Sequence, residues 1–187
     1  MQESAYSPDD EELTRAINSS DRAAFKQLCK RYYDPLYRFL WRKTRNHDSA
    51  QDLVQELFMN VWNRRARLDE KLSIKAYLYR AANNLAINHL RKKVLRQAHF
   101  VDNLDHAPAG HSDEERELQE CLDEALQYLP EAQRTVFVLN RFEGLKYDEI
   151  AETLQISIKT VESRMSQALK HLRAKFWPVI RTSRGVS

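Results

Sequence analysis

The chain has 187 residues, of which 42% are hydrophobic and 30% charged, with three glycines and a formal net charge of +3. So little glycine argues against sandwiches and barrels, which use it at turns with positive φ, and no apolar run reaches the roughly 18 residues that span a membrane. Two cysteines are too few for a disulfide framework or a thiolate metal cage. The N-terminus is acidic and lacks a signal-peptide pattern, so we expect a soluble, cytoplasmic, all-α protein.

The small net charge conceals a segregation along the chain. Residues 1–21 carry a net charge of −5, residues 22–97 +12, residues 98–132 −9 and residues 133–187 +5. Two basic blocks separated by an acidic stretch indicate two units that face a polyanion, with chance clustering on a solvated surface as the alternative.

Breaks in the apolar pattern divide the chain further. Residues 98–117 contain Pro108, Gly110 and many acids without an apolar period, which predicts a flexible acidic linker. We therefore expect five parts: an acidic N-terminal segment (1–21), a first helical unit (22–97), the linker (98–117), a second helical unit (118–176) and a tail (177–187).

The first unit opens with residues 21–41, whose apolar side chains have helical spacing. Pro35 either begins a helix there or kinks a longer one. Cys29 falls on the apolar side, where it predicts a small buried side chain. Asp48 with Gln51 three residues later has the pattern of a capping box and predicts the start of the next helix.

The helix after Asp48 is strongly amphipathic. Its apolar residues recur from Ala50 to Trp62 at i, i+3, i+4, i+7 and i+8. Its opposite face displays three polar side chains, those of Asp52, Gln55 and Glu56. A basic loop over residues 64–71 follows, with cations at Arg64, Arg65, Arg67 and Lys71.

Ser73 is placed to cap a long helix that runs to about residue 96. One side of this helix is apolar and predicts a core face of Ile74, Tyr77, Leu78, Ala81 and Leu85. Another side is a polar stripe roughly 16 Å long, made of Arg80, Asn84, Asn88 and Arg91. Because Asn and Arg can form paired hydrogen bonds with base edges, and Asn is a poor helix former, the stripe indicates base reading; an ordinary solvated face is the alternative.

The sequence pattern of the second unit predicts four helices. An amphipathic helix spans residues 118–129, and a second one, over 131–142, stops before Gly144, which suits a left-handed residue. A short helix around Ile150, a turn at 155–157 and a longer helix capped by Ser157 make a helix-turn-helix pattern, which a generic helical hairpin could also produce. The last helix would enter the major groove with Lys159, Thr160, Glu162, Ser163, Arg164, Gln167 and Lys170.

Three segments resemble the two domains of bacterial RNA polymerase sigma factors, in the short form of the extracytoplasmic-function (ECF) group. They are DLVQELFMNVW (52–62), AYLYRAANNLAINHLRKK (76–93) and LPEAQRTVFVLNRFEGLKYDEIAETLQISIKTVESRMSQALKHLR (129–173). The last of these is most similar to the iron-citrate-type sigma factors common in Bacteroidetes. The resemblance implies sigma region 2 for residues 22–97 and sigma region 4 for residues 118–176.

The resemblance also implies a function. It suggests an initiation factor that binds core RNA polymerase, directs it to specific promoters and assists DNA opening without covalent chemistry. It assigns the face of Asp52, Gln55 and Glu56 to the β′ clamp helices, the Arg80–Arg91 stripe to the minus-ten element and the 64–71 loop to a flipped base. The last helix would read the minus-thirty-five element in duplex DNA.

Further partners and contacts follow from the same resemblance. The polymerase β flap is a second core contact, and the resemblance suggests a membrane-anchored anti-sigma factor. Tyr77 and Tyr79 offer rings to unstacked bases, while helical spacing places Tyr77 in the core.

Two positions depart from the family pattern. Gln155 stands where the turn commonly has Gly, so backbone strain there is not relieved in the usual way. Glu162 stands where a basic residue is frequent, and a carboxylate accepts from cytosine N4 but repels phosphate. The preferred promoter element therefore does not transfer from other members.

Other chemistry is not indicated. The spacing of His99, His106, His111 and Cys121 is loose for a metal site, and the chain has no phosphate-cradling Gly loop or nucleophile–base motif. We expect no enzyme activity, no metal and no cofactor. Two other functions remain open from the residues alone: an autonomous helix-turn-helix regulator and a helical adaptor that binds no DNA.

Overall fold

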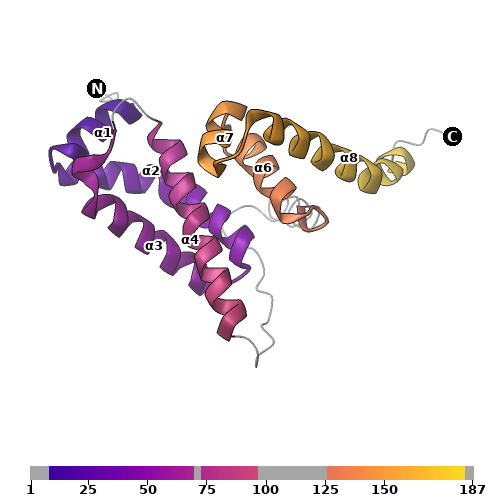
Figure 1. The fold of residues 1–187 in the computed structure, drawn as a ribbon, viewed down its shortest axis with the longest axis horizontal. Coiled ribbons are helices and arrows are strands. Elements are labelled where there is room, and N and C mark those ends of the chain that lie inside the picture. Colours follow the sequence, from indigo (N-terminus) through magenta and orange to yellow (C-terminus); the bar gives the residue numbers. More distant parts are fainter. Residues whose placement is uncertain (1–8, 70–72, 97–125, 184–187) are drawn as a thin grey trace, which may run out of the picture. The chain divides into compact units, whose positions relative to one another are not determined.

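The computed structural model describes residues 9–69, 73–96 and 126–183, without the side chains of 94–96 and 176–183. All regular structure in these residues is helical (Figure 1), which confirms the all-α prediction. The chain divides into two compact units, one within residues 1–106 (unit 1) and one within 107–187 (unit 2). No described helix is long and apolar enough to cross a membrane. The predicted linker lies outside the described residues, as do most of the helix predicted at 118–129 and the histidine-containing stretch.

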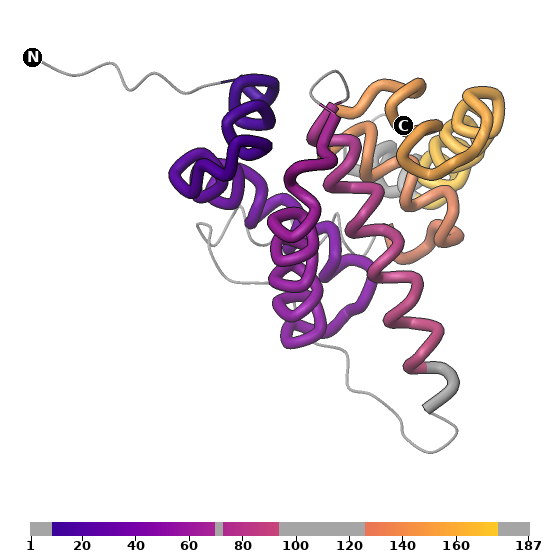
Figure 2. The backbone as a smooth tube through the Cα atoms, turned by 60° about the vertical axis from the view of Figure 1, so that its left-hand side comes forward, coloured from indigo at the N-terminus to yellow at the C-terminus, as the bar shows by residue number. Residues whose placement is uncertain are grey.

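The described residues of unit 1 form four α-helices and one short 3-10 helix. In chain order these are α1 (Asp10–Asn18), α2 (Arg22–Thr44), α3 (His47–Asn63), the 3-10 helix η1 (Arg65–Arg67) and α4 (Ile74–Arg96). Helices α2, α3 and α4 contact one another, and the tube in Figure 2 shows α3 running beside α4. Their shared core includes Leu28, Leu36, Leu40, Val54, Leu57, Leu78 and Ala82, all fully or almost fully buried.

Helix α1 forms within the acidic segment, for which the sequence predicted no helix. Asp9 caps it by accepting from the Glu12 backbone N–H at 2.8 Å, and acids in the first turn suit the positive end of a helix. Leu13 and Ile17, one turn apart, are buried. Part of the acidic segment therefore belongs to the core of unit 1.

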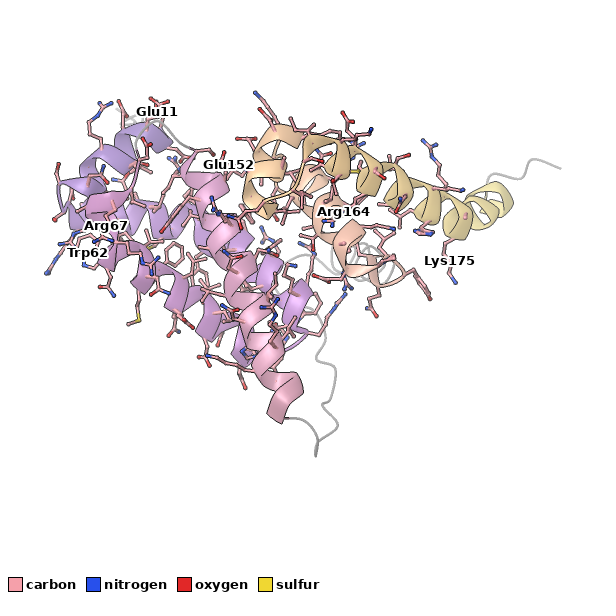
Figure 3. All side chains as sticks on the ribbon, in the orientation of Figure 1. Glu11, Trp62, Arg67, Glu152, Arg164 and Lys175 are labelled. Carbon is pink, nitrogen blue, oxygen red and sulfur yellow. The ribbon has the colours of Figure 1, made fainter. Side chains whose placement is uncertain are left out.

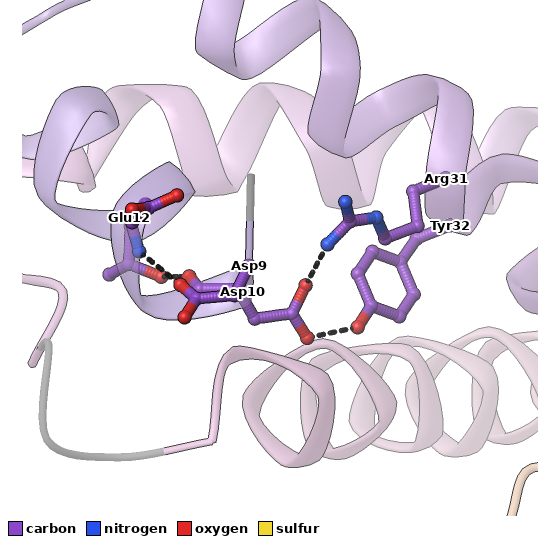
Figure 4. A network of polar contacts seen from close by, with 6 residues as sticks. Asp9, Asp10, Glu12, Arg31 and Tyr32 are labelled. Atoms are coloured by element: carbon purple, nitrogen blue, oxygen red, sulfur yellow. Dashed lines mark hydrogen bonds and ion pairs between the residues drawn. The ribbon is translucent and has the colours of Figure 1, made fainter. Parts of the chain in front are cut away.

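Asp10 fastens α1 to α2 (Figure 4). Its carboxylate accepts from Arg31 Nη1 at 2.6 Å and from the hydroxyl of Tyr32. Burial raises the pKa of the Tyr32 hydroxyl, and the hydrogen bond and negative charge of Asp10 raise it further. Tyr32 therefore stays protonated and serves as the donor.

The boundaries of α2 and α3 depart from the predicted ones. Pro35 lies inside a single α2 and does not begin a helix. Helix α2 ends at Thr44, and the next residue, Arg45, has the left-handed φ of 52°. The predicted cap of α3 at Asp48 is wrong, because Asn46 accepts from the Ser49 backbone N–H at 2.8 Å and α3 begins at His47. An earlier amide with the right backbone geometry thus outcompetes the capping-box pattern.

The core face of helix α4 is only partly the predicted one. Ser73 caps the helix as expected, accepting from the Ala76 backbone N–H at 3.2 Å. Ile74 and Leu78 are buried as predicted, whereas Tyr77, Ala81 and Leu85 are only half-buried. Tyr79 is 0% exposed and its ring meets Phe39 edge-on with centroids 5.3 Å apart, so it cannot stack on a base as predicted. The buried residues of the helix are Ile74, Ala76, Leu78, Tyr79, Ala82, Asn83 and Ala86.

Unit 2 is built on α6 (Glu131–Arg141), α7 (Tyr147–Leu154) and α8 (Ile158–Ser183), and α8 continues beyond residue 176, where the tail was predicted to begin. Gly144 has the predicted left-handed conformation, with φ 66°. The core between the helices includes Val136, Leu139, Ile150, Val161, Met165 and Ala168.

Helices α7 and α8 form the predicted helix-turn-helix. Gln155 directly follows α7 and has the left-handed φ of 55°. This backbone conformation is strained for residues other than glycine. Ser157 accepts from the Thr160 backbone N–H at 3.1 Å and so caps α8 as expected. The helix predicted at 118–129 precedes α6, and the structure describes only its residues from 126 onward. Leu126 and Gln127 are helical, and Leu126 is buried.

Candidate nucleic-acid interface

The outer face of α3 is acidic and polar. Asp52, Gln55 and Glu56 are exposed, while Leu53 and Leu57 between them hold the helix in the core. Met59 continues this face by one turn and is 65% exposed, a residue that the sequence analysis did not single out. Exposed carboxylates beside an exposed apolar side chain suit a basic protein surface.

A groove of about 490 Å³ lies between α3 and α4 (the α3–α4 groove). It brings together three residues of the predicted stripe with Arg64 from the start of the basic loop; Arg91 is exposed but does not line it. Asn60 of α3 and Tyr77 of α4 also line it. The full lining is Leu57, Asn60, Val61, Arg64, Tyr77, Arg80, Ala81, Asn84, Leu85 and Asn88.

The groove combines apolar and hydrogen-bonding groups. Leu57 and Val61 are buried, whereas Asn84 and Asn88 are exposed. The side chains of Arg80, Asn84 and Asn88 make no hydrogen bond or ion pair with other described residues, so their polar groups remain available to a ligand. An apolar surface and a ring flanked by amides and guanidinium groups can hold an unpaired base by stacking and by its edge.

The cations of the basic loop differ in role. Arg65 donates from Nε to Ser20 Oγ and from Nη1 to the Trp62 carbonyl, both at 2.9 Å, and its guanidinium lies 4.5 Å from the Trp62 ring centroid. These contacts hold its guanidinium against Ser20 and Trp62, and its predicted contact with DNA stays a prediction. Arg64 and Arg67 are exposed, and Figure 3 labels Arg67. Lys71 lies outside the described residues.

Helix α1 and the turn after it hold this loop in place. Asn18 Nδ2 donates to the Leu68 carbonyl at 3.1 Å, and Ser20 accepts from Arg65. The N-terminal helix thus supports the loop that borders the α3–α4 groove, a contribution that composition alone did not suggest.

Helix α8 carries the predicted duplex-reading residues, and Figure 3 marks Arg164 and Lys175 along it. Thr160 and Arg164 are half-buried, and the hydroxyls of Thr160 and Ser157 lie 2.8 Å apart at the helix cap. Ile158, not among the predicted residues, is 48% exposed at the first position of the helix. Five of the predicted residues are exposed: Lys159, Glu162, Ser163, Gln167 and Lys170.

Two of these side chains belong to a hydrogen-bonded string that the sequence analysis missed. Gln167 Nε2 donates to Ser163 Oγ at 3.3 Å, and Gln133 Nε2 of α6 donates to Gln167 Oε1 at 2.9 Å. His171 Nδ1 lies 2.8 Å from Gln133 Oε1. We call these four residues the α8 string.

Cys29 is half-buried, less enclosed than predicted. Burial raises the pKa of its thiol to about 11, while a backbone hydrogen bond acts weakly in the opposite direction. The side chain is therefore a neutral thiol near pH 7 and a poor nucleophile.

Comparison with known proteins gives one consistent result. The family model Sigma-70 region 2 matches residues 28–96, and the model Sigma-70, region 4 matches residues 119–172. The RNA polymerase sigma-H factor of Pseudomonas aeruginosa is 29% identical over 186 residues, which cover 92% of this chain and 96% of that protein. The ECF RNA polymerase sigma factor SigK of Mycobacterium bovis is 30% identical over 180 residues, 89% of this chain and 93% of that protein.

A solved structure agrees with these relatives. The sigma factor RpoE of Bartonella quintana, determined in complex with the anti-sigma factor NepR, has a TM-score of 0.69 and 26% identity. The similarity covers 80% of this chain and 94% of that one. Sequence and fold therefore point to the same group of proteins.

Proposed function

Because the chain belongs to the ECF group of RNA polymerase sigma factors, which direct polymerase to promoters, we propose that its two units divide promoter reading between them. Unit 1 binds the unpaired bases of the minus-ten element in the α3–α4 groove. Unit 2 binds the minus-thirty-five element as duplex DNA through α8. The observation that carries this division is the groove, where amide and guanidinium side chains without partners among the described residues border an apolar surface.

Core polymerase binds the outer face of α3 through its β′ clamp helices. Support comes from the exposed Asp52, Gln55 and Glu56 on a helix whose other face is locked in the core. A rigid acidic face complements a basic coiled coil, and charge complementarity of this kind accelerates and orients docking. Met59 adds an apolar contact to the same surface. The β flap is the second core contact, through unit 2.

Run-off transcription with purified core polymerase, with and without this protein, tests the function. We expect promoter-dependent transcripts from a genomic promoter library only when the protein is present. A library that yields no such transcript would contradict the function as a whole.

The α3 face is tested separately. Gln55→Ala combined with Glu56→Arg should weaken core binding at least tenfold, because a contact is lost and a like charge is introduced. The matched control is Asp34→Arg, a charge reversal of the same kind at an exposed carboxylate of α2. Core affinity that is unchanged in the first variant, or equally reduced in both, would contradict the assignment.

In unit 1, the polar stripe of α4 and the basic loop of residues 64–71 contact different parts of the DNA. Arg80, Asn84 and Asn88 bind base edges in the groove, and Arg91 binds the backbone beyond it. Arg64 and Arg67 bind the phosphates around a flipped base, with Lys71 completing the cationic loop. Arg65 shapes the loop, since its guanidinium is already bonded to Ser20 and Trp62.

In unit 2, the exposed residues near the start of α8 face the major groove. Lys159 and Lys170 bind phosphate, while Glu162, Ser163 and Gln167 meet base edges. Thr160 and Arg164 support the surface from half-buried positions.

An anti-sigma factor holds the protein inactive until a signal arrives. The support is the similarity to RpoE of Bartonella quintana, which was solved with the anti-sigma factor NepR. The form expected here is membrane-anchored. Pull-down with the tagged chain from a membrane fraction should recover one protein that blocks core binding; transcription that is fully active at all times in the cell would contradict this control.

Within the ECF group, the chain falls in the iron-citrate-type subgroup. The sequence SIKTVESRMSQALKHLR, over residues 157–173, supports this placement. Promoters transcribed by the reconstituted holoenzyme should share the element of an iron-citrate-type factor, and an unrelated element would contradict it.

A further inference from the structure

We propose that Gln133 of α6 and His171 of α8 are positioning residues that fix which hydrogen-bonding groups Ser163 and Gln167 present to duplex DNA. The inference rests on the proposed role of α8 and deepens it. Gln133 and His171 are not among the residues proposed to contact DNA. They would nevertheless determine part of the minus-thirty-five preference.

The geometry is that of a continuous chain of hydrogen bonds. Ser163, Gln167 and His171 follow one another at i, i+4 and i+8, so they share one stripe of α8. Gln133 reaches this stripe from α6 and bridges its last two members, with contacts of 2.9 Å to Gln167 and 2.8 Å to His171. Gln133 is only 9% exposed, whereas the three residues on α8 are exposed.

The chemistry of these groups gives the string a single direction. An amide oxygen only accepts, so His171 Nδ1 must carry the proton that Gln133 Oε1 receives. Both the neutral Nδ1–H tautomer and the imidazolium provide that proton. Gln133 then donates to Gln167 Oε1, which turns the Gln167 NH₂ group toward Ser163.

The direction of the string decides what the DNA meets. Because the Ser163 oxygen accepts from Gln167, one of its two lone pairs is occupied, and the hydroxyl proton and the second lone pair are left for an outside group. In the major groove, guanine, adenine and thymine each present an acceptor for that proton, while cytosine presents the N4 donor. We therefore expect selection against cytosine at the base that Ser163 faces, because cytosine can use only the one remaining lone pair and leaves the hydroxyl proton without an acceptor.

The string also explains why an exposed glutamine can read DNA selectively. A free glutamine side chain loses rotamer freedom when it binds and can flip its amide to match either a donor or an acceptor. Gln133 is nearly buried and uses both ends of its amide, so it imposes one orientation on Gln167 before DNA arrives. Pre-orientation of this kind gives specificity to a contact that would otherwise be adaptable.

The test changes the direction of the string without touching the DNA contacts. In Gln133→Glu, the new carboxylate still accepts from His171 but can no longer donate to Gln167. Gln167 would then turn its NH₂ group toward α6 and its oxygen toward Ser163. The Ser163 hydroxyl would donate inward and offer its lone pairs to DNA.

The measurement is run-off transcription by holoenzyme reconstituted from core polymerase and the full chain, on promoters with a randomised minus-thirty-five element, followed by transcript sequencing. For Gln133→Glu we expect cytosine to rise about fivefold or more at one or two adjacent positions, the lower range of discrimination by a well-placed contact. The other positions should keep their preference. Gln127→Glu, the same change at an exposed glutamine outside the string, should leave the whole profile unchanged.

A second variant covers the case in which the nearly buried carboxylate prevents folding. His171→Phe removes the first donor at an exposed position, and it should reduce selection against cytosine at the same positions by about twofold or more. A profile identical to wild type in the folded variants would overturn the inference, and so would a uniform loss at every position, which a merely structural role produces. If wild-type holoenzyme gives no promoter-dependent transcript, the proposed function itself fails, so the two failures are distinguishable.

Discussion

The two proposed DNA-reading surfaces are built in opposite ways. In unit 1, Arg80, Asn84 and Asn88 border a groove, and their side chains have no hydrogen bond to any other described residue. In unit 2, the side chains of Ser163 and Gln167 are held by the α8 string. Among the described residues, the first surface thus leaves these polar side chains without partners, and the second ties two of its side chains to its own framework.

This difference matches the two states of promoter DNA. Base edges in B-form DNA occupy fixed positions in the major groove, so a rigid array of donors and acceptors can read them. Unpaired bases have no fixed geometry and are held by stacking and by side chains that adjust to them. Under the proposed function, a single chain thus meets duplex DNA with pre-oriented groups and melted DNA with an open groove.

The largest expected effect tests whether α4 separates a core face from a groove face. Tyr79→Ala should destabilise unit 1 by about 3–5 kcal/mol, because Tyr79 is fully buried against Phe39. Tyr77→Ala, in the groove, should cost less than about 2 kcal/mol. Hydrogen exchange of α4 amides gives both values, and Tyr128→Ala, at a 60% exposed tyrosine of unit 2, is the control. If both substitutions lowered the free energy of unfolding equally, α4 would not have separate core and groove faces, and the assignment of the groove would be wrong.

The next effect concerns the unpaired amides of the groove. Asn84→Ala combined with Asn88→Ala should slow promoter opening at least tenfold, since each lost base contact costs about 1–3 kcal/mol. Core binding should be unchanged because α4 is not the polymerase face. Permanganate reactivity of the melted thymines and a core-binding titration measure the two properties, with Asn63→Ala, at an exposed position outside the groove, as control. Parallel loss of core binding would show that the stripe was misassigned.

Neighbouring arginines sharpen the comparison within unit 1. Arg65→Ala should lower the free energy of unfolding by about 1–2 kcal/mol, through loss of two hydrogen bonds and the contact with Trp62. Arg64→Ala should leave stability within about 0.5 kcal/mol of wild type and shorten the lifetime of the open promoter complex. Urea unfolding measures the stability of both variants, and competitor-challenged run-off transcription measures the lifetime of the open complex. Lost stability in Arg64→Ala with a shortened open complex only in Arg65→Ala would contradict the two assignments.

The smallest effect concerns the rigidity of unit 2. Gln155→Gly should stabilise unit 2 by about 0.5–1 kcal/mol, because the left-handed backbone at this exposed residue is strained for glutamine and relaxed for glycine. This gain is net of the opposing effect that glycine increases the conformational entropy of the unfolded chain. Gln155→Asn, which tolerates this conformation better, should give a smaller gain. Hydrogen exchange of α7 amides reports the change, and a loss of stability in the glycine variant would mean that the turn is not strained.

Strong periodicity made much of the fold predictable. The regular apolar repeat of α3 predicted both its core side and its outer face, and Ser73, Gly144 and Ser157 marked helix ends correctly. Helix α1 was missed because its charge dominates a short segment with two buried apolar residues. The core face of α4 was misjudged because apolar and small residues occur on several of its sides, so period alone did not select one.

The candidate sites divide in the same way. The stripe of α4 and the start of the basic loop were visible in sequence, and the structure brings Arg64, Arg80, Asn84 and Asn88 to one groove. Asn60 came from another helix and gave no local signal. Gln133 and His171 are 38 residues apart, so their contact depends on how α6 packs on α8, and the separate roles of Arg64 and Arg65 depend on one 3-10 turn.

The central claim, that unit 1 reads unpaired bases and unit 2 reads duplex DNA, is tested most directly by a crossed binding measurement. Holoenzymes carrying wild-type protein, Asn84→Ala with Asn88→Ala, or Ser163→Ala with Gln167→Ala are titrated at one salt concentration against a single-stranded minus-ten oligonucleotide and a duplex minus-thirty-five fragment. The account predicts that the first variant loses at least tenfold in affinity for the single strand alone, and that the second loses affinity for the duplex alone. Equal losses on both DNAs, or the reverse pattern, would contradict it.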